Sequence, residues 1–208
     1  MRIISIINPK GGCGKTTLAT SLAAKLTCDG YTVALRDMDR QMSAHDWCKR
    51  RPKGRPPISS LSGSSQQMYH LTFGRDFVIH DTQSAVYGYE LLRLLAGVDI
   101  VVVPVGPSTL DFEISTRVFE QLKKVPRVAS GRCKLLCVGN RWSAATTTQS
   151  DFSVADRQLR FSAVLSEHSA YVRAVSEGLG VLELDFPGSE NLHVEWAAFL
   201  SSLKSSPA

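Results

Sequence analysis

The chain has 208 residues, of which 43% are hydrophobic and 21% charged, as in an ordinary globular protein. Its formal net charge of +5 permits an anionic partner such as nucleic acid but does not require one. Neither a signal peptide nor a membrane-spanning run is visible, and the five cysteines lack metal-ligand spacing. These features argue against a membrane-spanning protein and a disulfide scaffold. They predict one cytoplasmic α/β domain over residues 1–208.

The first predicted element is a buried strand over residues 2–7, which leads directly into a glycine-rich stretch. A helix is predicted over residues 16–29, because Gly30 then stops it. Strand, glycine loop and helix in this order are typical of a phosphate-binding loop, whose backbone N–H groups and helix N-terminus bind phosphate. The stretch reads Asn8-Pro9-Lys10-Gly11-Gly12-Cys13-Gly14-Lys15-Thr16-Thr17.

The predicted phosphate ligands lie in and just after this loop. Lys15 is expected on the outer phosphates and the Thr16 hydroxyl on Mg²⁺. Pro9 stands where the usual motif has its first glycine, and Lys10 adds a second lysine at the other end of the loop. The alternative, a glycine-rich turn with two solvated lysines, does not account for the acidic residues downstream. The predicted set is Gly11, Gly12, Cys13, Gly14, Lys15, Thr16 and Thr17.

Two acidic residues follow at the end of the next predicted strand, which covers residues 31–37. Because the carboxyl ends of parallel strands share one edge of a sheet, Asp37 and Asp39 are expected beside the glycine loop. Carboxylates in that position can hold waters on Mg²⁺ and position an attacking water. They could also simply precede the short helix predicted over residues 43–50, since acids are favoured at a helix N-terminus.

A basic, proline-containing run covers residues 49–57 and predicts a loop. Such a run is either a solvated surface or a contact with DNA phosphate or a partner protein, and the sequence leaves both open. Residues 58–71 predict only a weak strand and a helix. The next clear strand, over residues 76–82, carries Asp81 near its end, where a carboxylate can hold Mg²⁺ through water. His80 is expected to pack in the core rather than to catalyse.

The remainder of the chain alternates helices and strands. This alternation predicts an α/β fold of the P-loop NTPase class, a doubly wound, mostly parallel sheet with helices on both faces. The last helix lacks a basic amphipathic face, so no membrane partner is expected. Predicted strands cover residues 99–105, 134–139 and 161–165, and predicted helices cover residues 87–96, 112–124, 151–159, 167–177 and 191–203.

The glycine loop resembles the deviant Walker A loop of the ParA/MinD family of ATPases, and Asn8-Pro9-Lys10-Gly11-Gly12 is especially similar to the short ParF-type plasmid partition proteins. Residues 37–43, Asp81 and residues 104–112 match further family segments in the same order. The resemblance implies ATP and Mg²⁺ as cofactors. It also implies a homodimer in which Lys10 reaches the ATP bound to the partner chain.

The same resemblance implies the roles of individual residues. Catalytic roles fall to Lys10, Lys15 and Asp39, and Asn140 would contact adenine. Asp111 either bonds across the dimer face or caps the helix from residue 112. Arg40 replaces the family's usual proline, and Thr82-Gln83-Ser84 also departs from the pattern, which leaves the hydrolysis rate open. The implied metal ligands are Thr16 directly and, through water, Asp37 and Asp81.

The function implied by the resemblance is a Mg-ATP-dependent dimerising ATPase that binds DNA without sequence preference. It would partition plasmid or chromosomal DNA on the nucleoid, stimulated by a ParB-like or other cargo-binding partner. One alternative is an ATPase that positions a protein cargo such as a chemosensory cluster. Another is a metabolic P-loop enzyme, although no acceptor-pocket motif is visible. Candidate DNA contacts are the basic run and Lys123, Lys124, Arg157, Arg160 and Arg173.

Overall fold

The computed structural model describes residues 1–61, 72–143 and 159–204. Within these ranges seven strands form one sheet in the order β3-β2-β4-β1-β5-β6-β7, and every pairing is parallel. The predicted doubly wound parallel sheet is therefore confirmed. The strands are β1 (Arg2–Ile6), β2 (Val33–Asp37), β3 (Ser59–Leu61), β4 (Phe77–Asp81), β5 (Ile100–Val105), β6 (Lys134–Trp142) and β7 (Ala163–Ser166).

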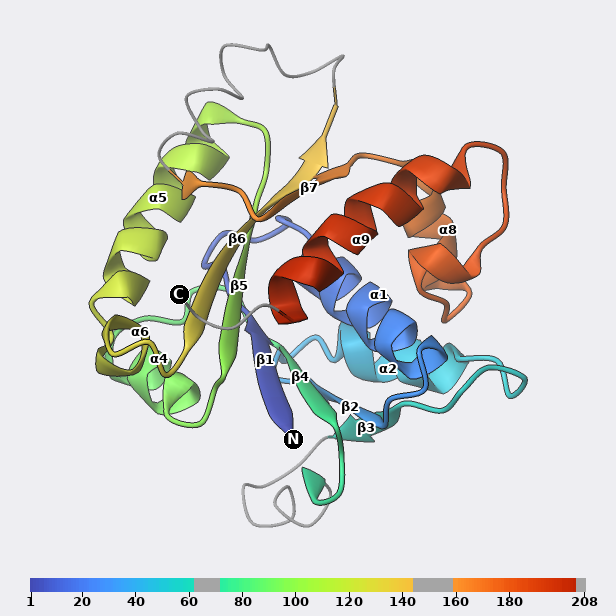
Figure 1. Cartoon of the computed structure of the whole chain (residues 1–208), viewed down its shortest axis with the longest axis horizontal. Coiled ribbons are helices and arrows are strands. Elements are labelled where there is room, and N and C mark those ends of the chain that lie inside the picture. Colours follow the sequence, from blue (N-terminus) through green and yellow to red (C-terminus); the bar gives the residue numbers. More distant parts are fainter. Residues whose placement is uncertain (62–71, 144–158, 205–208) are drawn as a thin grey trace.

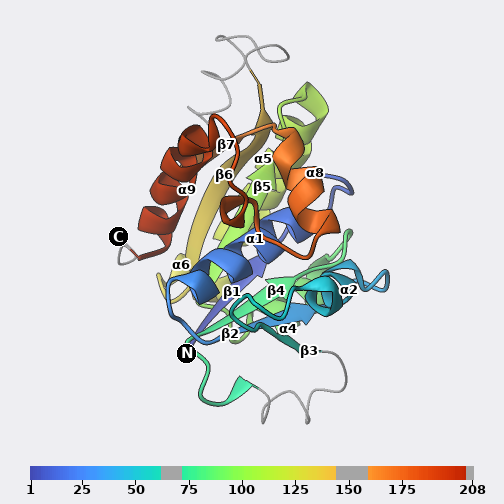
Figure 2. The same ribbon diagram turned by 90° about the vertical axis from the view of Figure 1, so that its right-hand side faces the viewer.

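Helices cover both faces of the sheet, as Figures 1 and 2 show. One face carries α1 (Lys15–Cys28), α2 (Ser43–Arg50), α8 (Ser169–Ser176) and α9 (Ser189–Lys204), with the short 3-10 helix η1 (Val181–Glu183) beside them. The other face carries α4 (Gly88–Leu95), α5 (Thr109–Lys123) and α6 (Pro126–Ala129). Among the described residues, no helix is both long and apolar enough to cross a membrane.

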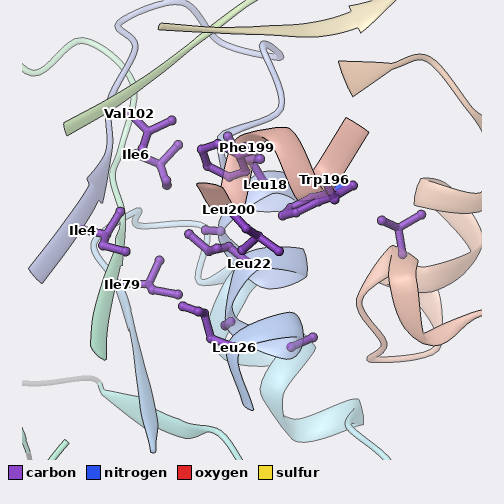
Figure 3. Close-up of a cluster of buried hydrophobic side chains, with 14 of the residues drawn as sticks. Ile4, Ile6, Leu18, Leu22, Leu26, Ile79, Val102, Trp196, Phe199 and Leu200 are labelled. Atoms are coloured by element: carbon purple, nitrogen blue, oxygen red, sulfur yellow. The ribbon is translucent and has the colours of Figure 1, made fainter. Parts of the chain in front are cut away.

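The larger hydrophobic core lies under α1 and α9 and consists of fully buried aliphatic and aromatic side chains. Leu18 and Leu22 of α1 meet Trp196 and Phe199 of α9 above the strand residue Ile6 (Figure 3). Burying side chains of this size contributes about 1.5–3 kcal/mol each. This packing fixes α1, and with it the glycine loop at the start of α1, against the centre of the sheet.

The glycine loop lies where the winding of the sheet reverses. Strand β1 has β4 on one side and β5 on the other, and successive connections move away from it in both directions. The carboxyl ends of strands at such a switch point form the usual ligand crevice of an open parallel sheet. The fold therefore brings the loop after β1 and the ends of β2 and β4 to one edge.

Helix α5 begins earlier than the sequence predicts. Ser108 is its N-cap, and the Ser108 hydroxyl accepts a hydrogen bond from the Asp111 backbone N–H at 3.1 Å. Asp111 therefore lies inside the first turn, and the expectation that it caps a helix from residue 112 is wrong. The helices predicted within residues 58–71 and over 151–159 fall largely outside the described residues.

One residue of the basic run after α2 fits neither predicted role, a solvated surface or a contact with DNA or a partner protein. Arg51 is buried and forms a two-pronged ion pair with Glu183 of η1, with N–O distances of 2.8 and 3.0 Å. Its Nε also donates to the carbonyl of Pro56. Arg51 thus ties the loop to the C-terminal part of the chain and is neither solvated nor available to DNA.

Candidate functional site

The glycine loop has the backbone that a phosphate cradle needs. Gly12 and Gly14 adopt φ of 76° and 90°, in the left-handed region that favours glycine. A Cβ at Gly14 would also lie 2.3 Å from the Asn140 side-chain nitrogen, so no larger residue fits there. Gly14 is the N-cap of α1, which places the helix N-terminus directly behind the loop.

Two asparagines hold the loop from opposite sides. Asn8 is buried and donates through Nδ2 to the carbonyl of Pro104 at 2.7 Å, while its Oδ1 accepts from the Lys10 N–H. Asn140 donates through Nδ2 to the carbonyl of Cys13 at 2.8 Å. Asn140 lines the cleft described below, and its contact with adenine stays a prediction. The structure adds a supporting role for Asn140 that its residue type alone did not indicate.

The lysine of the loop is largely buried and points into the site. Lys15 Nζ donates to the carbonyl of Lys10 at 3.2 Å and to the Ser84 hydroxyl at 3.0 Å. Ser84 belongs to the segment after β4, and the next residue, Ala85, donates its N–H to the carbonyl of Pro9. The loop and the segment after β4 are therefore one connected unit around the Lys15 ammonium group.

Two carboxylates lie side by side at the ends of neighbouring strands. Asp37 of β2 is directly opposite Asp81 of β4, and both are buried. Like charges in this position are destabilising unless something compensates them. Burial raises the pKa of Asp81 to about 7, and the carboxylates of Asp37 and Asp39 add to the rise against the opposing Thr16 hydroxyl and Lys15.

The donor set at this point fits a hydrated Mg²⁺ ion. The Thr16 hydroxyl approaches Asp81, but neither buried oxygen of this carboxylate has a hydrogen bond of normal geometry. A cation or its waters would complete them. Asp37 is already engaged, because its oxygens accept from the backbone N–H groups of Asp39 and His45 at 2.9 Å. Among the described residues, no three His, Cys, Asp or Glu side chains gather closely enough to hold a metal alone. Thr16, waters and nucleotide phosphates would supply the remaining ligands.

Asp39 follows the end of β2 by two residues and lines the cleft described below. It is partly exposed, and its Oδ1 accepts from the Gln41 N–H at 3.0 Å, which closes a tight turn before α2. Arg40 in this turn points its side chain into solvent and has no ion-pair partner among the described residues. Its replacement of a proline therefore leaves the turn intact.

These side chains surround a cleft of about 580 Å³, within the usual size of a small-molecule site. The predicted residues Gly11, Gly12, Gly14, Lys15, Thr16, Thr17, Asp39 and Asn140 line this cleft. Asp37 and Asp81 are buried and do not line the cleft, and Cys13 lines a neighbouring hollow. The lining residues that the sequence did not reveal are Gln41, Ser84, Arg141, Glu167, His168, Tyr171, Val172 and Val175.

Most of the missed residues come from α8 and the loop just before it. His168 caps α8 by accepting from the Ala170 N–H, and its ring stacks on Phe186. Tyr171 accepts a hydrogen bond from the Trp196 indole N–H, and burial raises the pKa of its hydroxyl. Only their position after the last parallel strand could have indicated these residues, because no local motif marks them.

Lys10 lies at the side of the loop, away from the main cleft. Its ammonium group pairs with the Asp111 carboxylate of the same chain, at the rim of a hollow of about 280 Å³. The Asp111 carboxylate also bonds to the Ser108 hydroxyl. Burial raises the pKa of Asp111, but its bonds to Lys10 and Ser108 outweigh burial and hold the pKa below its usual value. The contact of Lys10 with a second chain stays a prediction.

The candidate DNA contacts are scattered over the surface. Lys123 pairs with Glu120, and Arg173 pairs with Glu177, on exposed helix faces. Lys124 and Arg160 are exposed, whereas Arg157 lies outside the described residues. Lys123 and Lys124 lie at the end of α5 on one face of the sheet and Arg173 lies on α8 on the other, so these three do not form one patch (Figures 1 and 2).

The fold and the site agree with a comparison of sequences, in which residues 4–181 match the CobQ/CobB/MinD/ParA nucleotide binding domain. The chain belongs to this family. A family relative, the maintenance of carboxysome distribution protein A of Halothiobacillus neapolitanus, is 27% identical over 193 residues, which cover 89% of this chain and 88% of the relative. The expected ParA/MinD membership is confirmed.

Solved structures agree on the fold of the family. The MinD cell division protein of Aquifex aeolicus gives a TM-score of 0.75 at 16% identity and covers 100% of this chain and 99% of its own. A plasmid partition protein of Borrelia burgdorferi bound to AMPPNP gives a TM-score of 0.73 at 18% identity and covers 97% of this chain and 99% of its own. At these identities the likeness shows the shared fold.

Proposed function

We propose that this family member is a Mg-ATP-dependent ATPase that dimerises on ATP, binds DNA without sequence preference, and uses this cycle to partition DNA. The observation that carries the proposal is the buried, unpartnered carboxylate of Asp81 opposite Asp37, beneath a loop that holds Lys15. A cation in front of these two carboxylates would offset their mutual repulsion and would in turn bind the anionic phosphates.

The chain's own groups divide the chemistry as follows. Bound Mg²⁺ supplies positive charge to the phosphates. Lys15 and the loop N–H groups orient the outer phosphates, and the Thr16 hydroxyl faces the cation. Asp39, which lines the same cleft, positions the attacking water. Lys10 of a second chain would add a cation at the phosphates once it leaves Asp111.

A second candidate differs only in the cargo. The relative from Halothiobacillus neapolitanus is named for the distribution of carboxysomes, which are protein bodies, and it covers most of this chain. The same ATPase cycle in this protein could therefore position a protein assembly. Deleting the protein from its host distinguishes DNA partition from cargo positioning. Loss of plasmid or chromosome inheritance would support partition, whereas clustering of a protein assembly would support positioning.

The first experiment measures binding to a random-sequence DNA duplex with ATP–Mg²⁺, with ADP–Mg²⁺ and without nucleotide, across a salt series. We expect binding only with ATP, and a steep fall in affinity as salt rises, because phosphate contacts release counterions. Binding that is equal in all three states would contradict a nucleotide-gated DNA surface. Absence of binding in every state would leave the ATPase assignment and remove the DNA role.

A further inference from the structure

A second hollow lies on the other face of the sheet, between β2, β4 and α4, and has a volume of about 550 Å³. None of its lining residues lines the nucleotide cleft. Its volume falls in the range of small-molecule sites, about 300–1,000 Å³. Its lining includes Arg36, Met38, His80, Gln83, Glu90 and Arg93.

The floor of this hollow carries a cation without a counterion. Arg36 of β2 is partly buried and has neither an ion pair nor a side-chain hydrogen bond within the described part of the chain. Burial lowers the pKa of Arg36. Its neighbour across the sheet is His80 of β4, which bonds to the Ser5 hydroxyl at 2.9 Å. Burial, together with Arg36, lowers the pKa of His80 to about 3, so the imidazole is neutral and adds no charge beside Arg36.

A second cation reaches the hollow from the helix above. Arg93 of α4 is exposed and has no side-chain partner within residues 1–61, 72–143 and 159–204. The one carboxylate in the lining, Glu90, is already bonded to the Gln83 amide at 3.0 Å. The wall also includes the apolar or aromatic residues Met38, Val86, Tyr89 and Leu94, and Thr82, whose hydroxyl donates to the Ile6 carbonyl. A partly buried guanidinium without a counterion costs free energy, and an anion bound beside Arg36 would lower that cost.

We propose that the hollow is a second ligand site, which binds a small compound with one carboxylate or phosphate group and an apolar body. Arg36 and Arg93 hold the anionic group, since guanidinium groups bind carboxylate and phosphate through paired, charge-assisted hydrogen bonds. The apolar body lies along the Met38, Val86 and Leu94 side of the hollow. The hollow contains two arginines and only one carboxylate, which is already bonded to Gln83, so we expect its ligand to be an anion.

The ligand would act on the phosphate-binding loop through a short path. Gln83 forms part of the hollow, and the next residue, Ser84, accepts from Lys15 in the nucleotide cleft. Ala85 then donates to Pro9 and has a φ of 61°, a left-handed conformation that is strained for a non-glycine residue. The segment of residues 82–86 therefore lines the hollow through Gln83 and the nucleotide cleft through Ser84. This coupling, unlike the binding itself, rests on the proposed ATPase function.

The binding test uses phenyl phosphate and benzoate as probes on the full chain with ¹³C-methyl methionine, after the nucleotide cleft has been saturated with ADP–Mg²⁺. Met38 lines the hollow, and Met1 at the exposed N-terminus serves as an internal reference. We expect a saturable shift of the Met38 methyl signal with one or both anions and none with the uncharged benzyl alcohol. A response to both probes indicates a general anion site. A response to phenyl phosphate alone indicates a phosphate ligand, and a response to benzoate alone indicates a carboxylate ligand.

The variants separate binding from folding. Arg93→Met changes only an exposed helix side chain and is expected to weaken binding of the anionic probe at least tenfold. Arg36→Lys keeps the positive charge, so it should weaken binding less than Arg36→Met does. Arg173→Met is the matched control, because Arg173 is an exposed arginine of α8 that pairs with Glu177. Equal binding by Arg93→Met and Arg173→Met would overturn the proposal, as would a Met38 signal that never responds.

Coupling has a readout of its own. Nucleotide and ligand must change each other's affinity by the same factor if the two sites are linked. We expect saturating phenyl phosphate to change the ADP affinity of the wild type at least threefold and that of Arg93→Met hardly at all. An unchanged ADP affinity in the wild type would refute the coupling but not the site. Failure to hydrolyse ATP would refute the proposed function while the Met38 shift still stood.

Discussion

Asp39 is the residue at which charge and backbone structure can be separated. Its Oδ1 accepts from the Gln41 N–H, so an asparagine at this position keeps the turn while removing the charge. If the carboxylate positions the attacking water, both Asp39→Ala and Asp39→Asn should lower ATP turnover by about 10²-fold or more and still form ATP-dependent dimers. Turnover and dimer formation are measured on the same samples. Near-normal turnover by Asp39→Asn would reduce Asp39 to a turn-forming residue.

Lys15 is expected to bind phosphate rather than to stabilise the fold. Its ammonium group lies in the nucleotide cleft on the Lys10 carbonyl and the Ser84 hydroxyl. Lys15→Ala should therefore lower ADP–Mg²⁺ affinity at least about tenfold, or about 1.4 kcal/mol, as measured by calorimetry. Lys25→Ala is the control, because Lys25 lies on the same helix and pairs with Asp29 far from the cleft. Unchanged affinity for Lys15→Ala would refute the assignment of the loop.

At the scale of elements, the buried pair of Arg51 and Glu183 joins the loop after α2 to η1. Removing one partner leaves a buried charge, so Arg51→Met should lower the free energy of unfolding by about 3–5 kcal/mol at neutral pH. Lys53→Met, in the exposed part of the same loop, should change it by less than about 0.5 kcal/mol. Urea unfolding measures both, and equal stability of the two variants would contradict the role of Arg51.

The pH dependence of this pair has a definite sign. Burial raises the pKa of Glu183, but hydrogen bonds from Arg51 and the Gly180 N–H outweigh burial and hold it below the ordinary value. A carboxyl whose pKa is lowered on folding contributes stability above its unfolded pKa and loses it as the pH falls through the folded pKa. In Arg51→Met the carboxyl takes up a proton more readily. The gap in stability between wild type and variant should therefore narrow as the pH is lowered from about 7 to about 4.

The same elements show what could be predicted from sequence. The order of strands and helices and the glycine loop followed from apolar runs, glycines and terminal acids, all of which are local signals. Arg51 and Asp111 could not be placed, because their partners Glu183 and Lys10 lie about a hundred or more residues away along the chain. The α8 wall of the nucleotide cleft was missed for the same reason. Pairings set by tertiary packing leave no local pattern in a single sequence.

At the scale of the whole molecule, the question is whether Lys10 serves its own ATP or that of a second chain. In the single chain its ammonium group pairs with Asp111 beside the loop, outside the cleft that Lys15 lines. From that position, Lys10 is better placed to reach the ATP of a second chain than the ATP in the cleft of its own chain. Lys10→Ala should accordingly keep nucleotide affinity and lose ATP-dependent dimerisation or turnover.

A mixture of two inactive variants decides between the two arrangements. In a mixed dimer of Lys10→Ala and Asp39→Ala, the site on the first chain has its own Asp39 and receives Lys10 from the second, so it is complete. Random pairing of equal amounts gives about one quarter of the wild-type turnover if Lys10 acts on the partner's site, since half of the dimers are mixed and each has one complete site. If Lys10 acts on its own chain's site, neither site in the mixed dimer is complete and the mixture stays inactive. Turnover is therefore measured for each variant alone and for the mixture at the same total concentration, and activity no higher than the mean of the two variants would overturn the two-chain site.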